Sequence, residues 1–134
     1  MSTRTTNRAA VVLAWVLAAS FVVGFLTKFW PGETFFGPPY SVKFVEWGYP
    51  SWFRFVVGIG ELAGAVMLLI PRLRFLGCLL LAVILEGAIV THVVNDNPLR
   101  ESVAAPITLA LLAMVAVASS PIVVRQLLSA TESY

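Results

Sequence analysis

Two adjoining apolar stretches decide the fold: Trp52–Ile70 (WFRFVVGIGELAGAVMLLI) and Phe75–Val94 (FLGCLLLAVILEGAIVTHVV). The short basic segment Pro71–Arg74 (PRLR) joins them. Each stretch is long enough to cross a bilayer as a helix, since about 20 apolar residues span a hydrocarbon layer of roughly 30 Å. The sequence therefore predicts a transmembrane helical hairpin.

The composition of the whole chain indicates the same class of protein. Of the 134 residues, 59% are hydrophobic and 12% are charged, and the mean hydropathy is +0.89. Soluble domains average about 45–50% apolar and about 25% charged residues. We therefore predict a single integral membrane domain over residues 1–134, in contact with the lipid bilayer. A net charge of +2, spread along the chain, argues against a nucleic-acid partner.

Two further apolar stretches complete a predicted all-α bundle of four transmembrane helices. The four helices are expected at about residues 9–28, 52–70, 75–94 and 104–124. A cleaved signal peptide is the alternative interpretation of the first stretch. Its apolar run continues beyond the candidate cleavage site at Ala18–Ser20, which favours a retained helix.

The segment between the first two predicted helices is rich in glycine, proline and aromatic residues. Glycine and proline break regular structure, and tryptophan and tyrosine favour the membrane–water interface. We expect an interfacial loop that caps the bundle, with a lid over an intramembrane site as the alternative. A short helix over Ser41–Trp47, with Ser41 as its N-cap and Gly48 at its end, is compatible with this pattern.

Each helix of the hairpin carries a carboxylate near its middle, Glu61 or Glu86. A charge at the centre of a bilayer costs roughly 2.5 kcal/mol or more, so both acids are expected to face the bundle interior. Counted outward from the turn, Glu61 is level with Ile84, and Glu86 lies only about 3 Å further along its helix. We expect the two acids to share a proton, which suits acid–base chemistry. A structural clasp between Glu61 and Arg54 or a backbone group is the alternative.

Further candidate residues surround these acids. Arg54 and His92 form a second predicted polar level near the loop-rich end of the hairpin. The candidate residues by role are: catalytic, Glu61, Glu86 and His92; substrate-binding, Arg54, Trp52, Trp47 and Tyr49; helix-packing, Gly58, Gly60 and Gly64. With one cysteine and one histidine, the chain alone is predicted to hold no disulfide and no metal.

Basic residues determine the predicted orientation. In a chain of four spans, the turn with Arg72 and Arg74 lies on the same side as both termini. Lysine and arginine favour the cytoplasmic side of a membrane. We therefore predict a multi-pass protein of the cell membrane with both termini in the cytoplasm.

A run of about 45 residues carries a family resemblance. It comprises Gly48-Tyr49-Pro50-x-Trp52, Gly-Ile-Gly-Glu-Leu-Ala-Gly-Ala at 58–65, Leu-Leu-Ile-Pro-Arg at 68–72, Gly77 and His92. In these residues the chain resembles the DoxX-like membrane family. The resemblance implies a four-helix membrane bundle and points to Glu61 and His92, whereas Glu86 is not part of the pattern. Members of that family include a subunit of a thiosulfate–quinone oxidoreductase and bacterial proteins tied to membrane redox and thiol stress.

Three functions are compatible with the sequence. The first is an accessory subunit of a membrane redox system, which meets a quinone between the second and third helices and joins an oxidoreductase partner or a homodimer. The alternative is a small isomerase, cyclase or hydrolase that acts on a lipophilic substrate through Glu61, Glu86 and His92. The third is an interaction protein whose GxxxG face, Gly60 and Gly64, binds another membrane chain.

Overall fold

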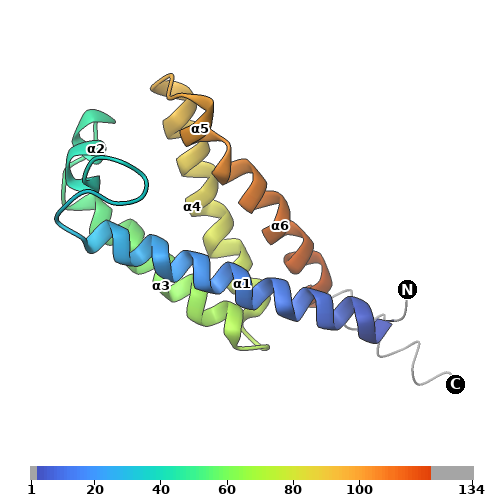
Figure 1. Cartoon of the computed structure of the whole chain (residues 1–134). Helices are drawn as coiled ribbons and strands as arrows, with labels where there is room; N and C mark the ends of the chain where they lie inside the picture. Colours follow the sequence, from blue (N-terminus) through green and yellow to red (C-terminus); the bar gives the residue numbers. More distant parts are fainter. Residues whose placement is uncertain (1–2, 122–134) are drawn as a thin grey trace, which may run out of the picture.

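The computed structural model describes residues 3–121 (Figure 1). This part of the chain is helical and contains no strand, which confirms the predicted all-α class. The helices are α1 (Thr3–Phe29), α2 (Tyr40–Glu46), α3 (Phe53–Leu69), α4 (Arg74–Val94), α5 (Leu99–Ser102) and α6 (Ala104–Ser119).

The four longer helices pack in a ring of neighbours. α1 lies along α3, α3 turns back into α4, α4 packs against α6, and α6 returns to α1. The α1–α3 pair and the α4–α6 pair meet near the α3–α4 turn and diverge toward the end that carries α2 and α5 (Figure 1). Small and branched side chains fill the common core, among them Ala14, Leu68, Leu81, Leu112 and Val115.

Three helical segments are long and apolar enough to cross a membrane: Arg8–Phe29, Arg74–Val94 and Leu99–Ser119. These segments support a multi-pass membrane protein. The fourth predicted span stays a prediction, because α3 has 17 residues, about 26 Å of helix. The predicted end of the last helix at residue 124 lies outside the described residues.

Glycines let α3 approach its neighbours closely. A Cβ atom added to Gly60 would lie 2.9 Å from Cδ1 of Ile84, and one added to Gly64 would overlap the Leu81 side chain. A Cβ atom on Gly58 would lie 3.1 Å from the ring of Phe29 on α1. The face formed by Gly60 and Gly64 is therefore covered by α4. The interpretation that this face binds another membrane chain is wrong.

The α2 helix begins one residue earlier than expected. It starts at Tyr40, and the carbonyl oxygen of Pro39 accepts hydrogen bonds from the backbone N–H groups of Val42 and Lys43. Ser41 is thus inside the helix, and its predicted N-cap role is wrong, because proline already supplies a backbone suited to a helix start. Gly48 follows the helix with a φ of +93°, a conformation that favours glycine, and redirects the chain toward α3.

Candidate functional site

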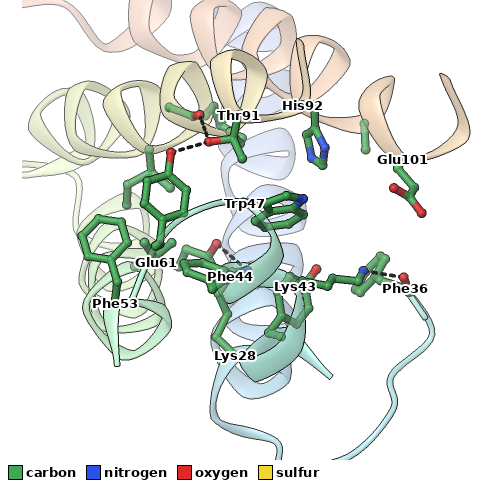
Figure 2. Close-up of a pocket in the computed structure, with 18 of the residues that line it drawn as sticks. Lys28, Phe36, Lys43, Phe44, Trp47, Phe53, Glu61, Thr91, His92 and Glu101 are labelled. Atoms are coloured by element: carbon green, nitrogen blue, oxygen red, sulfur yellow. Dashed lines mark hydrogen bonds and ion pairs between the residues drawn. The ribbon is translucent and has the colours of Figure 1, made fainter. Parts of the chain in front are cut away.

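A cavity of about 970 Å³ lies between the diverging helices at the α2 end of the molecule. Its wall is mainly aromatic and aliphatic, with Phe44 from α2, Trp47 directly after it, Phe53 from α3, and Leu80 and Ile84 from α4. Lys28, Lys43, Glu61, Thr91, His92, Arg100 and Glu101 add polar groups to this wall (Figure 2). The cavity thus combines an apolar body with a small number of polar side chains, as ligand sites commonly do.

An ion pair crosses from α1 to α3 at one side of the cavity. The Lys28 Nζ atom lies 2.9 Å from Oε1 of Glu61, and the two side chains are only 11% and 9% exposed. Gly24 makes room for this carboxylate, because a Cβ atom there would lie 2.5 Å from Oε2 of Glu61. Within the described residues, that Oε2 atom is buried and accepts no hydrogen bond. The pair therefore leaves one buried acceptor free.

The ring of Tyr40 lies between two ammonium groups. Lys28 Nζ is 4.6 Å and Lys43 Nζ is 4.8 Å from the ring centroid, distances typical of cation–π contacts. Lys43 also donates a hydrogen bond of 2.5 Å to the backbone oxygen of Phe36. Burial, and after it the nearby charge of Glu61, raises the pKa of Tyr40 to about 12. Burial also lowers the pKa of Lys43.

Tyr49, which follows α2, is hydrogen-bonded to α4 on the opposite side of the cavity. Thr91 Oγ1 donates to the backbone oxygen of Gly87 at 2.7 Å. The hydroxyl of Tyr49, also 2.7 Å from Oγ1, must therefore be the donor in their shared hydrogen bond. Figure 2 shows Trp47 facing His92, with their rings edge to face and 5.4 Å apart.

The hydrogen bonding of His92 defines its tautomer. Its Nδ1 atom lies 2.7 Å from Nδ2 of Asn97. An amide nitrogen only donates, so Nδ1 is the acceptor and the neutral ring carries its proton on Nε2. The Nε2–H group of His92 is thus a hydrogen-bond donor in the cavity wall.

The comparisons with known proteins identify a family. A family model described as the DoxX-like family matches residues 11–117. The chain belongs to the DoxX-like family. The matched residues include Gly24, Lys28, Glu61 and His92. No curated protein and no solved structure matches the chain.

The structure brings only some of the predicted site residues of this DoxX-like protein together. Glu61, His92, Trp47 and Tyr49 line the cavity. Glu86 is exposed on α4 and does not. The prediction that Glu61 and Glu86 share a proton is therefore wrong. Two residues beyond Ile84, the helix has turned by about 200°, so Glu86 points away from the face that Ile84 presents to the cavity.

Arg54 and Trp52 also lie outside the cavity wall. Trp52 is 62% exposed. The Arg54 guanidinium carbon lies 4.2 Å from the ring centroid of Phe55, and its Nε and Nη1 atoms make no hydrogen bond to any described residue. The clasp predicted between Glu61 and Arg54 is wrong, because Lys28 takes that place.

The residues of the site that the sequence-based prediction missed include Gly24, Lys28 and Tyr40. Lys28 ends the first apolar run, and a cation at a helix end is commonly an interfacial anchor. Its position one helical turn after Gly24 was the available signal, since it places a small residue and a cation on one face. Among the described residues, no group of three or more His, Cys, Asp or Glu side chains is arranged to hold a metal ion.

Proposed function

We propose that this DoxX-like protein is an accessory subunit of a membrane redox system and that its cavity binds a quinone or quinol. The observation that carries the proposal is the buried ion pair of Lys28 with Glu61 in the wall of a largely apolar cavity. A quinol combines an aromatic ring, hydroxyl groups and an apolar tail. These parts match the aromatic wall, the free carboxylate oxygen and the lipid environment.

The head group of the ligand has a defined partner. A quinol hydroxyl donates a hydrogen bond to the Glu61 carboxylate, whose Oε1 atom lies 2.9 Å from Lys28 Nζ. The unbonded Oε2 atom lies against Gly24, and in this proposal it turns toward the cavity when the ligand binds. A hydrogen bond to a charged group contributes about 1.5–3 kcal/mol, against about 0.5–1.5 kcal/mol for a neutral one. The oxidised quinone has no O–H group to donate. The site therefore favours the quinol over the quinone.

Aromatic side chains hold the ring. Phe44, Trp47 and Tyr49 line one side of the cavity, and Phe44 contacts each of the other two at centroid distances of 5.5 and 5.9 Å. Such a cluster offers both faces and edges for stacking. In this proposal electrons pass to and from the oxidoreductase partner, and this chain positions the ligand.

A binding experiment tests the proposal. The purified protein in lipid nanodiscs is titrated with a short-tailed benzoquinol and with the matching benzoquinone, and the heat of binding is measured. Glu61→Gln replaces a charged acceptor by a neutral one, so we expect the Kd for quinol to rise roughly 5- to 10-fold, the equivalent of about 1–1.5 kcal/mol. The Kd for quinone should change much less.

Glu86→Gln is the matched control, because it alters a carboxylate of the hairpin that does not line the cavity. It should leave both Kd values unchanged. A wild-type protein that binds neither compound beyond its partition into empty nanodiscs would refute the binding site. A protein that binds quinol but co-purifies with no oxidoreductase would refute the accessory role alone.

An acid–base enzyme is the second candidate function. It is favoured by one observation, that Glu61 and His92 line the same cavity. Glu86 takes no part in this version of the hypothesis. It requires turnover of a lipophilic substrate that Glu61→Gln abolishes and Glu86→Gln preserves, while both variants remain folded.

A further inference from the structure

An exposed stripe runs along the side of α4. Its residues follow each other at alternating steps of three and four: Leu76, Leu79, Val83, Glu86, Val90 and Val93. All of them are exposed, and Val90 and Val93 are 59% and 68% exposed. This spacing is that of positions a and d in a heptad, the pattern of a helix that packs against another along a left-handed crossing. Within the described residues, α3 and α6 pack against the other side of α4, where Gly77, Cys78, Leu81 and Leu85 are buried.

Glu86 is the one polar residue in this stripe, and it lies deep within a candidate membrane span. It is eight residues from the end of the span at Val94 and twelve from its start at Arg74. These separations correspond to about 12 and about 18 Å along the helix axis, too far for a glutamate side chain to reach either interface. Lipid chains cover apolar side chains well, but they offer no hydrogen bond to a carboxyl group.

No described residue satisfies Glu86 either. The structure gives its side chain no hydrogen bond and no ion pair to any part of residues 3–121. Ionisable residues within membrane spans rarely face lipid and almost always pair with a polar group. The missing partner must supply a polar group at the same depth in the membrane.

We propose that α4 forms a homodimer interface in which the stripes of two copies pack together and Glu86 meets Glu86 of the second copy. A two-fold axis along the membrane normal places identical residues of two copies at identical depths. A protonated carboxyl group has one O–H donor and also accepts, so two such groups satisfy each other. A different partner chain would need a matching polar group at this depth, whereas a second copy carries one by symmetry.

The interface and the proposed quinol site share one residue, because Val83 belongs to the stripe and also lines the cavity. Glu86 does not line the cavity, and the ion pair of Lys28 with Glu61 joins α1 and α3. Variants of Glu86 therefore test the dimer, and variants of Glu61 test ligand binding.

Cysteine cross-linking tests the interface geometry. The buried Cys78 is first replaced by alanine, and single cysteines are then introduced in place of Leu79 or Val90. Val16→Cys on α1 and Ile107→Cys on α6 are the controls, since these residues are 59% and 55% exposed and lie within candidate membrane spans, as Leu79 and Val90 do. In dilute proteoliposomes with a mild oxidant, we expect most of the protein to form disulfide-linked dimers at 79 and 90, and only a few per cent at 16 and 107. Equal cross-linking at the control positions, or none at 79 and 90, would overturn the proposal.

Variants of Glu86 test its role in the interface. Subunits are counted by stepwise photobleaching of labelled protein in liposomes. The wild type and Glu86→Gln should be dimers, because an amide also donates and accepts. Glu86→Leu preserves the apolar surface but removes the hydrogen bond, and it should weaken dimerisation at least 10-fold while quinol binding and unfolding temperature stay unchanged. A monomeric wild type, a Glu86→Leu variant that dimerises as well as the wild type, or a complex with a different chain at this face would each refute the proposal.

Discussion

Loss of one partner of the ion pair between Lys28 and Glu61 should destabilise the protein strongly, although the pair as a whole is replaceable. Lys28→Met removes the cation and keeps a side chain of similar length. It leaves the Glu61 carboxylate, only 9% exposed, with no neutralising charge. The perturbation therefore isolates the cost of an uncompensated buried charge.

The magnitude follows from burial. Breaking a buried ion pair by removing one partner costs about 3–5 kcal/mol, whereas replacing both partners by apolar residues is often neutral or stabilising. With side chains 11% and 9% exposed, this pair belongs to the buried class. We expect Lys28→Met to lower the free energy of unfolding by about 3 kcal/mol or more. The double variant Lys28→Met/Glu61→Leu should recover most of that loss.

The assay is unfolding by sodium dodecyl sulfate in mixed micelles, followed by circular dichroism. Lys43→Met is the matched control, because Lys43 is equally buried but hydrogen-bonds a backbone oxygen, so its loss leaves no carboxylate alone. The control removes one hydrogen bond from a charged donor, so it should cost about 1.5–3 kcal/mol and less than Lys28→Met. A Lys28→Met protein as stable as the control, or a double variant as damaged as the single one, would refute the reasoning.

Two further predictions concern the neighbours of this pair. Gly24→Ala should destabilise the protein by about 1–3 kcal/mol, because the new Cβ would lie 2.5 Å from Oε2 of Glu61. The control Gly87→Ala, whose Cβ would have nothing within 4 Å, should be neutral or stabilising in the same unfolding assay. Equal effects of the two alanines would contradict this. The phenol of Tyr40, whose pKa is raised from 10.0 to about 12, should ionise only at high pH. The folded state holds this proton more tightly than the unfolded state does. The contribution of Tyr40 to stability is therefore intact below pH 10 and is lost between about pH 10 and pH 12. The ultraviolet difference between wild type and Tyr40→Phe measures this titration, and a midpoint near 10 would show that the ring is not buried.

The sequence was sufficient for the class of fold because the relevant signals are local. The lengths of the apolar runs and the Pro71–Arg74 turn predict α4 and its hairpin with α3 to within a residue or two. The depth of Glu86 within α4 also follows from counting alone. Rotation about the helix axis does not, because it depends on which neighbours pack on each side. Two residues of sequence separate Ile84 from Glu86, yet one faces the cavity and the other is exposed.

The ion-pair partner of Glu61 could not be predicted from the sequence of the hairpin alone. Lys28 and Glu61 lie on different helices, and their contact depends on how α1 slides along α3. Gly58 and Gly24 fix that contact, one by admitting Phe29 and the other by admitting the Glu61 carboxylate. A prediction confined to the hairpin considered Arg54 and Glu86 as partners for Glu61 and omitted the first helix.

The packing of one arginine also affects the predicted orientation of the protein in the membrane. Arg74, one of the two arginines on which the predicted orientation rests, is buried, and its Nε atom donates to the backbone oxygen of Leu68 at 2.7 Å. It closes the end of α3, where carbonyl groups lack helical partners. Of these two arginines, only Arg72 is exposed. The cytoplasmic placement of the termini therefore stays a prediction that rests on fewer charges than a count of arginines suggests.

The polar groups of the bundle differ in whether the chain itself satisfies them. Thr91 bonds to Gly87 and Tyr49, and Arg74 bonds to Leu68. In the four longer helices, two carboxyl groups keep an acceptor without a partner in residues 3–121: Glu61, whose Oε2 atom is buried against Gly24, and Glu86, which is exposed. Because a membrane interior offers no water, each is a candidate for a contact with another molecule. The two proposals assign a small molecule in the cavity to Glu61 and a second subunit to Glu86.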